Sequence, residues 1–517
     1  MISEKDNKIV YLIIILTCVF LSFSHSLYQV AINGGLTISE IIKYPEPLSP
    51  MKYYYHNSWT LLHQFAEILL NSGLSIDNSS RAILFLSTLC FGISSFLIVN
   101  KLTFNKYLAL LVSILMLILQ KNFGDTDYPS LIFSNQSYGM FSLALTSLIF
   151  SLILNENFKY SGFFTLLLIS VHPVIGFWML SILVISLIIY KDKKISLEFF
   201  KGGSFGLVIT LISLFFFYSN YIEKVEFDSS LYKIYMELWD GHRNLSGIVH
   251  YEYLIKTLLL FATLNTYYFL QKNKQKNFFH LIINSSITFS TIFYLSYKFF
   301  PNLFPDIFIR LMPTRFLILH SFIGWPLIIS IIYFIFLKLN SIKKFVQIFV
   351  FAVLIIHSIQ HYKKLIFLKN NFMINISKEN KLYNFDIFKE ISKLDYKGYF
   401  ITSSDTVNYV NQYSLKPVLL DTQSLDFLPY HPYLIKVSFE ILEDIYDVQM
   451  NNPPNKNDPR IPNEFIKKSF EAKNKSDWEY IKKKYNANYV VVPKNWKMNL
   501  NLLKSNNFYS IYQIEKS

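Results

Sequence analysis

Long blocks of apolar residues recur along the first 360 residues of this chain, and they constrain its fold more than any other feature. A helix that crosses a bilayer needs about 17–25 predominantly apolar residues. Since lipid offers no hydrogen bonds to the backbone, each block is expected to be a helix. Charged residues make up only 16% of the chain, whereas soluble domains carry about 25%. The sequence therefore predicts an α-helical polytopic membrane protein.

The blocks predict about eleven spans. Their expected bounds are 9–26, 82–99, 107–120, 138–154, 161–172, 173–190, 203–219, 253–270, 278–297, 316–337 and 345–360. The spans 161–172 and 173–190 are separated at His172–Pro173, because a residue that precedes proline avoids the helical region. They are two short passes or a re-entrant hairpin. The first block is expected to be an uncleaved anchor, since no small-residue cleavage site follows it.

Lysine positions predict the orientation of these spans. With a cytoplasmic N-terminus, the cytoplasmic segments total 47 residues with fifteen Lys, and the opposite loops total 123 residues with ten Lys or Arg. Such an excess is expected on the cytoplasmic side. The predicted outer loops are 27–81, 121–137, 220–252 and 298–315. We therefore expect a transmembrane domain, residues 1–360, and a soluble extracytoplasmic domain, residues 361–517.

The C-terminal region alternates short strands with helices, which is typical of a small α/β domain. The expected strands are Gly398–Thr402, Pro417–Leu420, Tyr489–Val492 and Phe508–Ile514. The expected helices are Phe385–Leu394, Thr406–Tyr413, Trp478–Tyr485 and Leu502–Asn506. The domain has no glycine-rich phosphate loop and no metal-ligand spacing, so the sequence assigns it no chemistry of its own.

The net charge of +14 raises the question of a nucleic-acid partner. Many of the lysines lie in short segments between spans, where they set the orientation. No basic stripe is interleaved with aromatic residues, so no nucleic acid is expected as a partner.

The first outer loop contains the first candidates for catalysis. Glu40 and Glu46 follow the first span closely, and either can act as a general base. Tyr55 and His56 lie further along the same loop and are candidate substrate-binding residues. Aromatic residues are also typical of the membrane–water interface, so Tyr55 is either a substrate-binding residue or an interfacial one.

The second outer loop contains a pair of carboxylates, Asp125 and Asp127, in the segment Gly124–Pro129. Two carboxylates in one turn can share a divalent cation, Mg²⁺ or Mn²⁺, or offer a general base. Gly and Asp also suit a turn for purely structural reasons.

Arginine is rare in this chain, with five Arg against 44 Lys, and all five fall on the predicted outer side. Arginine offers a planar, bidentate donor for phosphate or carboxylate. Arg310 and Arg315 precede a span, and Arg243 lies in the third outer loop, so they are candidate substrate-binding residues. Interfacial snorkelling is the alternative interpretation.

His172 is a further candidate for substrate binding, because it lies at the break between two spans. A polar residue near membrane depth suggests function. A hydrogen bond to a neighbouring helix is the structural alternative.

This arrangement resembles the GT-C superfamily of polytopic glycosyltransferases. The shared features are a first helix that starts inside, an acidic residue in the long outer loop, a second acidic site between later spans and an outer C-terminal domain. The resemblance implies sugar transfer from a lipid-phosphate-linked donor, with Glu40 or Glu46 as base. Asp125 or Asp127 would form the second acidic site, and Arg310 or Arg315 would hold the phosphate. The paired acidic residues usual in the family's first loop are absent here.

Two other functions are compatible with the sequence. A transporter or flippase of a lipid-linked or anionic substrate needs polar groups within the bundle, whereas these candidates lie in outer loops. A non-catalytic assembly protein needs neither arrangement. We therefore expect a glycosyltransferase at the outer face of a bacterial inner membrane, with membrane lipid as a partner.

Overall fold

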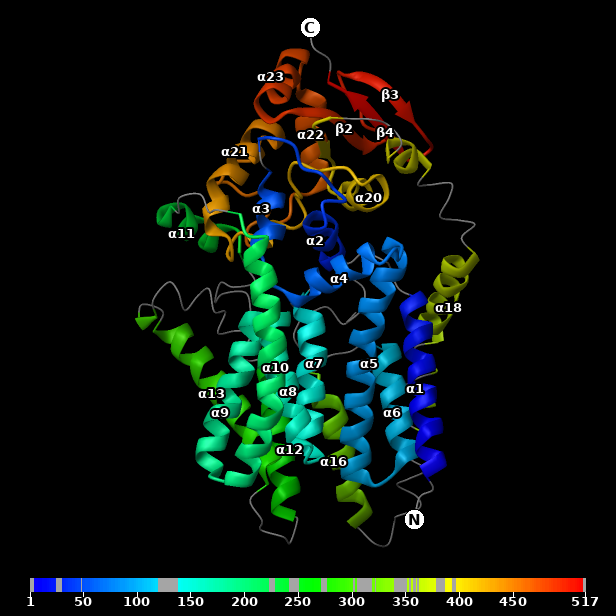
Figure 1. The fold of residues 1–517 in the computed structure, drawn as a ribbon, viewed down its shortest axis with the longest axis vertical. Coiled ribbons are helices and arrows are strands. Elements are labelled where there is room, and N and C mark those ends of the chain that lie inside the picture. Colours follow the sequence, from blue (N-terminus) through cyan, green and yellow to red (C-terminus); the bar gives the residue numbers. More distant parts are fainter. Residues whose placement is uncertain are drawn as a thin grey trace.

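The computed structural model shows a bundle of upright helices with a mixed α and β domain above it (Figure 1). It describes residues 4–24, 30–47, 49–119, 138–222, 228–240, 251–270, 277–300, 303–304, 319–320, 322–338, 351–352, 355–356, 359, 362–377, 386–392 and 397–514. Statements about structure below concern these residues.

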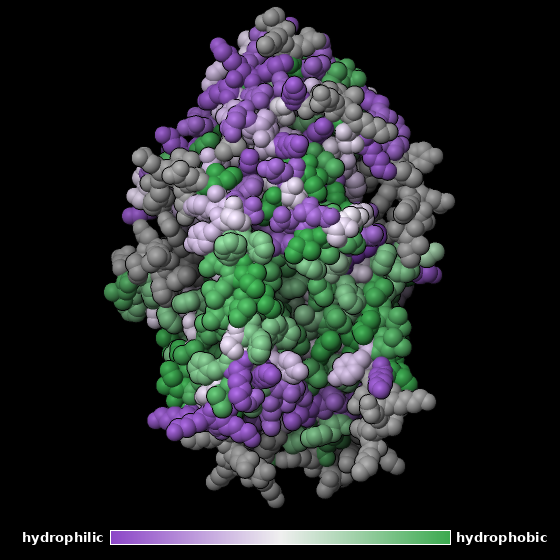
Figure 2. All heavy atoms as spheres, viewed as in Figure 1, coloured by the Kyte–Doolittle hydropathy of each residue, from purple (hydrophilic) through white to green (hydrophobic). Residues whose placement is uncertain are grey.

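The bundle is built from apolar helices. They are α1 (Glu4–Ser24), α5 (Ile76–Thr103), α6 (Lys106–Leu119), α7 (Tyr138–Leu154), α8 (Phe158–Val171), α9 (Pro173–Tyr190), α10 (Lys193–Ser219), α12 (Tyr251–Leu270), α13 (Phe278–Phe299) and α16 (Gly324–Lys338). Among the described helices, four are long and apolar enough to cross a membrane, in α5, α9, α10 and α13. Figure 2 shows a hydrophobic band across one face of the bundle, between hydrophilic surfaces above and below it. The chain is a multi-pass membrane protein.

The predicted break at His172 is confirmed, since α8 ends at Val171 and α9 begins at Pro173. The His172 backbone is extended, and its Nδ1 atom accepts a hydrogen bond from the backbone N–H of Ile175 at 3.4 Å. Gly176 lies against the backbone of Ile169. The two helices therefore fold back on each other as a tight hairpin.

The first outer loop is more ordered than its Gly and Pro residues suggest. It forms three short helices, α2 (Val30–Ile38), α3 (Pro50–Asn57) and α4 (Leu61–Asn71). Ser49 caps α3 with its hydroxyl and Pro50 occupies its first turn, while Thr60 caps α4. Proline and small hydroxyl residues start helices as well as interrupting them. These helices lie between the bundle and the C-terminal domain (Figure 1).

The C-terminal domain contains a four-stranded sheet. Its strands are β1 (Tyr399–Thr402), β2 (Ala487–Pro493), β3 (Asn501–Ser505) and β4 (Tyr509–Gln513). The order is β1-β2-β4-β3, with β1 parallel to β2 and the other neighbours antiparallel. Its helical segments are α20 (Val407–Tyr409), η3 (Val410–Ser414), η4 (Leu425–Phe427), η5 (Pro432–Leu434), α21 (Ile435–Tyr446), α22 (Asn463–Ala472) and α23 (Lys475–Tyr485).

Two predictions for this domain were wrong. The segment Leu502–Asn506 was expected to be a helix, but it belongs to strand β3 and its turn. The Asn506 side chain accepts hydrogen bonds from the backbone N–H groups of Phe508 and Tyr509 and so closes a hairpin with β4. The segment Pro417–Leu420 makes only an isolated bridge, between Val418 and Phe400.

The core of the C-terminal domain includes side chains from the outer loops of the bundle. The third outer loop forms α11 (Ser229–Leu238), which packs against α21. Tyr235 donates its hydroxyl proton to the Leu425 carbonyl at 2.7 Å, and the Trp239 indole N–H donates to the Met450 carbonyl at 2.7 Å. Both aromatic side chains are fully buried.

The first outer loop is bonded to the domain in the same way. The Tyr399 hydroxyl accepts from the Ser49 N–H at 3.0 Å and lies 2.7 Å from the Pro45 carbonyl oxygen. The Ser49 hydroxyl donates to the Leu419 carbonyl at 2.7 Å. The first and third outer loops therefore both bond to the C-terminal domain, and these buried contacts fix its position above the bundle.

One helix after the bundle, α18 (Tyr362–Ser377), packs along α1. Phe372 contacts Phe20 and Phe23, with ring centroids 4.9 and 6.1 Å apart. The chain therefore stays against the bundle for several turns before it enters the domain.

Candidate functional site

Part of the predicted site lies outside the described residues. This part comprises Asp125, Asp127, Arg243, Arg310 and Arg315. The predicted cation between the two aspartates therefore stays a prediction. Among the described residues, no group of three His, Cys, Asp or Glu side chains is placed to hold a metal ion.

Three histidines gather between the bundle and the C-terminal domain. His56 ends α3, His63 lies in α4, and His431 comes from the segment between η4 and η5. All three are buried, and His63 lies within electrostatic range of the other two. We call these residues the histidine cluster.

A hydrogen bond at Nδ1 holds His56 in one tautomer, and its other ring nitrogen, Nε2, has no hydrogen-bond partner among the described residues. Its Nδ1–H donates to the Asn220 backbone carbonyl at 2.8 Å, so in the neutral ring Nε2 carries the lone pair. Nε2 is buried and has no hydrogen-bond partner among the described residues. Burial lowers the pKa of His56, the Asn220 carbonyl opposes this, and Lys52 and Glu40 act in opposite directions at longer range. The lowered pKa favours the neutral ring at pH 7.

His63 is the most deeply buried member of the cluster. Its Nε2 lies 2.5 Å from the Tyr138 hydroxyl at the start of α7, and its ring packs edge-on against Tyr55. Its ring also fills the space over Gly34 in α2, where no Cβ fits. Burial lowers its pKa to about 3, so it is neutral and joins α2, α4 and α7.

His431 is fully engaged in hydrogen bonds. Its Nε2 lies 2.9 Å from the Ser58 hydroxyl, and its Nδ1 lies 3.1 Å from the Tyr433 hydroxyl. Tyr433 also accepts from the Asn57 side-chain amide at 2.9 Å. These bonds attach the C-terminal domain to the turn between α3 and α4, beside His56.

Sequence reasoning missed both His63 and His431. A signal for His431 is present in the printed sequence, because Tyr430–Tyr433 repeats the mixture of Tyr and His found at Tyr53–His56. The two segments lie more than 370 residues apart, and Tyr54 packs edge-on against His431 with a centroid distance of 5.5 Å. His63 lies in an apolar helix and carries no comparable local signal.

The two glutamates of the first outer loop lie in different surroundings. Glu40 is exposed at the end of α2, with a left-handed φ of 56°, and lies within electrostatic range of His56. Glu46 is exposed where the loop meets the C-terminal domain, and its backbone carbonyl accepts from the Asn486 side chain at 3.0 Å. The structure brings Glu40, and not Glu46, to the histidine cluster.

Of the two other described candidates, Tyr55 contacts the cluster and His172 lies at the start of α4. Tyr55 is 2% exposed, and its ring contacts both Tyr54 and His63, so it packs against the cluster. The Thr60 hydroxyl donates to the Val171 carbonyl at 2.8 Å, which places the neighbouring His172 at the start of α4.

The chemical capacity of this region follows from His56. A neutral imidazole with a free lone pair can take a proton from a hydroxyl or amine that approaches Nε2. The Asn220 carbonyl and the Glu40 carboxylate both favour the imidazolium that would form. The Lys52 ammonium in the same neighbourhood favours a negatively charged group.

Comparison with known proteins gives matches of overall shape. The structure is similar to ArnT from Cupriavidus metallidurans bound to undecaprenyl phosphate, with a TM-score of 0.47 and 10% identity over 100% of this chain and 99% of that one. For ArnT in the apo state the TM-score is 0.43, with 10% identity over 99% of each chain. For the archaeal oligosaccharyltransferase AglB from Archaeoglobus fulgidus it is 0.43, with 11% identity over 94% of this chain and 70% of that one.

ArnT and AglB are membrane glycosyltransferases with the GT-C fold. No protein-family model matches the sequence, and no curated protein is similar to it at a significant level. With identities of 10–11%, the similarity concerns the fold alone, and the function is argued from the residues of this chain.

Proposed function

We propose that this protein is a membrane glycosyltransferase. It transfers a sugar from a polyprenyl-phosphate-linked donor to an acceptor at the outer face of a bacterial inner membrane. The observation that carries the proposal is the free, buried Nε2 of His56, beside Glu40 and Lys52 at the outer end of the bundle.

The proposed transfer uses the histidine as the base. His56 Nε2 takes the proton of the acceptor hydroxyl or amine as that group attacks the anomeric carbon of the donor sugar. The bond between this carbon and the phosphate oxygen breaks, and its electron pair leaves with the polyprenyl phosphate. Glu40 stabilises the imidazolium, and positive charge stabilises the departing phosphate.

The proposal gives the remaining sequence candidates roles that follow from their charges. Arg310 or Arg315 would hold the phosphate bidentately, and Lys52 would add a point charge. Asp125 or Asp127 would form a second acidic site, with or without a divalent cation. Arg243 and His172 would bind substrate at its edge.

The transporter alternative needs a polar path through the bundle. Among the described residues of the bundle, Asn265 of α12 forms a polar group with His280 and Asn284 of α13. These residues bond to one another at 2.9–3.2 Å, as expected for side chains that join two membrane helices. They lie near the helix ends that face away from the C-terminal domain (Figure 1), so they favour a structural role.

The test is sugar transfer by the purified full-length protein with a panel of polyprenyl-phosphate sugars and acceptors. We expect His56→Gln to lose at least a hundred-fold in turnover, the lower end of the effect of a general base. Glu40→Gln should lose roughly ten-fold, since it removes a charge that acts through the imidazole.

Glu46→Gln and Asp127→Asn complete the comparison of predicted carboxylates. Glu464→Gln serves as the matched control, because this carboxylate is exposed on α22 in the C-terminal domain. Transfer that continues at the wild-type rate in folded His56→Gln would exclude the histidine as base. If only Asp127→Asn abolishes transfer, the base lies in the second outer loop.

A further inference from the structure

An open pocket of about 430 Å³ lies at the turn between α9 and α10. This turn is at the end of the bundle away from the C-terminal domain, whereas Asn220, the partner of His56, is at the other end of α10 (Figure 1). Ligand sites in proteins have volumes of about 300–1,000 Å³, so the pocket is large enough for a lipid headgroup. It is lined by Lys191, Asp192, Lys193, Ser196, Leu197 and Phe200.

Lys191 and Lys193 bring two ammonium groups to this pocket. Both side chains are exposed, and neither forms an ion pair with any residue that the structure describes. The one carboxylate in the lining, Asp192, caps α10 and accepts hydrogen bonds from the backbone N–H groups of Lys194 and Ile195. Two ammonium groups and one carboxylate give the lining a net charge of +1. The pocket therefore favours an anion with a single charge.

Exposed apolar side chains continue from the pocket along α10. Leu197 and Phe200, which line the pocket, are 54% and 72% exposed. Val208, Leu211 and Phe215 extend this exposed face at helical spacing. In Figure 2 the hydrophobic band of the bundle ends at a hydrophilic surface on the side away from the C-terminal domain. A charged pocket that adjoins a face suited to acyl chains has the two-part chemistry of a phospholipid.

The hydrogen-bonding groups of the lining indicate which headgroup fits. The Ser196 hydroxyl donates to the Asp192 backbone carbonyl at 2.9 Å, so the Ser196 oxygen and the Asp192 carboxylate remain as acceptors. A glycerol headgroup offers hydroxyl donors to both, and its phosphodiester carries the single negative charge that the lining favours. An ethanolamine lipid has no net charge, and a phosphate monoester carries about −1.5 to −2, so both match the lining less well.

We propose that this pocket binds phosphatidylglycerol, with the phosphate between Lys191 and Lys193, the glycerol hydroxyls at Asp192 and Ser196, and the acyl chains along α10. The lipid belongs to the leaflet farther from the C-terminal domain, so it is neither the donor nor the acceptor of the transfer proposed above. The site adds the binding of a membrane lipid that is not consumed. It is independent of the proposed transfer and is tested without turnover.

The first experiment measures the reactivity of single lysines in the full-length protein. Nanodiscs of phosphatidylcholine, with or without phosphatidylglycerol, are treated with an uncharged amine-acetylating reagent, and the acetylation rate of each lysine is followed by mass spectrometry. We expect phosphatidylglycerol to slow the acetylation of Lys191 and Lys193 roughly three-fold or more, as when most sites are occupied. Lys101 in the last turn of α5 and Lys106 at the start of α6 lie at the same end of the bundle and report the general effect of an anionic membrane.

The second experiment measures the affinity of the purified protein in detergent for phosphatidylglycerol by native mass spectrometry. Lys191→Gln/Lys193→Gln should weaken binding roughly ten- to thirty-fold, because each lysine beside an anionic lipid contributes about five-fold. Lys101→Gln/Lys106→Gln removes the same charge at the same end of the bundle and is the matched control. It should bind within about two-fold of the wild type, since exposed charges at a distance are screened.

Three outcomes would overturn the proposal. One is that phosphatidylglycerol slows the acetylation of all four lysines equally. Another is that phosphatidylethanolamine, or inorganic phosphate added to phosphatidylcholine nanodiscs, protects Lys191 and Lys193 as well as phosphatidylglycerol does. Protection by inorganic phosphate would identify a site for free anions and not for a lipid. The third is that the two double variants lose the same affinity.

Discussion

The Nδ1 atom of His56 lies 2.8 Å from the backbone carbonyl oxygen of Asn220, and this bond joins the end of α3 to the end of α10. A carbonyl only accepts hydrogen bonds, so Nδ1 carries the proton of the neutral ring. The lone pair is then at Nε2, which has no hydrogen-bond partner among the described residues. Reactivity at His56 therefore depends on a backbone group that no side-chain substitution removes.

The first prediction concerns the pH dependence of transfer. Burial lowers the pKa of His56, which favours the reactive neutral form at pH 7. Turnover should therefore fall on acidification, with an apparent pKa below the ordinary value of about 6.5. The measurement is kcat/KM from pH 4.5 to 8.5 with saturating acceptor. Glu40→Gln should move this acidic limb to lower pH, because it removes a charge that raises the pKa.

An acidic limb that stays in place in Glu40→Gln would show that the carboxylate does not act on the imidazole. A limb near pH 4 that disappears in Asp127→Asn would assign the titration to a carboxylate instead. The two outcomes separate His56 from the acidic residues of the sequence prediction.

The second prediction concerns stability at low pH. The pKa of His63 is lowered to about 3 in the folded protein by burial, against about 6.5 when unfolded. Below pH 6.5 the unfolded chain therefore binds a proton that the folded protein does not. The contribution of His63 to the free energy of unfolding should fall by about 1.4 kcal/mol per pH unit as the pH decreases toward 3.

Other buried groups titrate in the same range, so the quantity to measure is a difference. The melting temperatures of the wild type and of His63→Gln are compared from pH 4 to 8. The variant should be less stable at pH 8, where it loses the packing against Gly34, and the gap should narrow on acidification. A gap that is constant across this range would mean that His63 is not neutral when buried.

The sequence predicted several helices of the bundle well, because apolar spans carry local signals. Apolar length and the position of His172–Pro173 gave the helix pair α8 and α9 almost to the residue. The helices of the first outer loop were not predicted, since they are short and their apolar faces pack partly on the bundle and partly on the C-terminal domain. Tyr235 shows the difficulty, because its partner Leu425 lies 190 residues away in the chain.

The candidate site was predicted only in part, for a related reason. Glu40 and His56 were found because polar residues concentrate in the first outer loop. The local sequence does not distinguish Glu40 from Glu46. The difference arises because the loop around Glu46 folds onto Tyr399 of the C-terminal domain. His431 belongs to a domain that shows no catalytic motif, so its place in the histidine cluster can be seen only from tertiary contacts.

The third prediction compares two glycines in helices. At Gly34 an added Cβ would overlap the His63 imidazole, whereas at Gly203 the nearest atom, of the Leu166 side chain, lies 3.4 Å away. Gly34→Ala should therefore destabilise the protein by about 1–3 kcal/mol through overpacking. It should also reduce transfer, because His63 supports the helix that follows His56.

Gly203→Ala is the matched control and should be neutral or stabilising by up to about 1 kcal/mol, since alanine is the better helix former. Melting temperature and transfer rate are measured for both variants. Equal stability of the two would show that the ring of His63 moves aside without cost.

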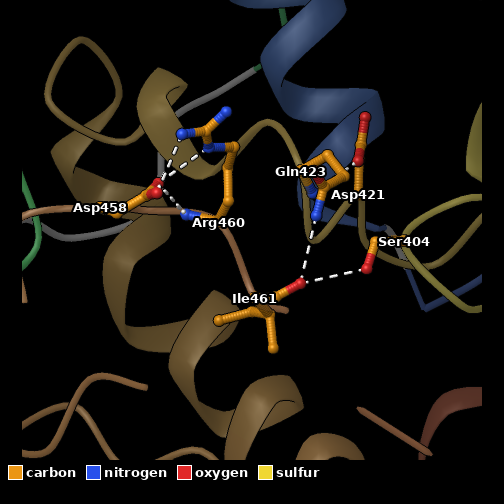
Figure 3. A network of polar contacts seen from close by, with 6 residues as sticks. All are labelled: Ser404, Asp421, Gln423, Asp458, Arg460 and Ile461. Carbon is orange, nitrogen blue, oxygen red and sulfur yellow. Dashed lines mark hydrogen bonds and ion pairs between the residues drawn. The ribbon is translucent and has the colours of Figure 1, made fainter. Parts of the chain in front are cut away.

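The last prediction concerns Asp421, which lies within the network of polar contacts shown in Figure 3. The carboxyl is 1% exposed, and its Oδ1 accepts from the Gln423 N–H at 2.9 Å. Burial raises the pKa of Asp421 to about 6, although hydrogen bonds from Gln423 and Ser424 oppose the shift. Tyr44 of the first outer loop lies within electrostatic range, so this carboxyl is close to where the loop meets the domain.

The sign of the effect is opposite to that of His63. Between pH 3.8 and 6 the folded protein holds a proton that the unfolded chain releases, so this contribution to stability is complete below pH 3.8 and lost as the pH rises through 6. Asp421→Asn keeps an acceptor for the Gln423 N–H and carries no charge. It should be more stable than the wild type by roughly 1–3 kcal/mol at pH 7.5, with no advantage near pH 4.

Thermal unfolding of the two proteins at both pH values tests this, with the exposed Glu443→Gln on α21 as control. A variant that is less stable than the wild type at pH 7.5 would mean that the carboxylate is ionised and bound by a positive group. A stabilised variant would show that the junction between the outer loop and the C-terminal domain contains a carboxyl that the fold prefers to keep protonated, so that their attachment weakens as the pH rises from 3.8 to about 6.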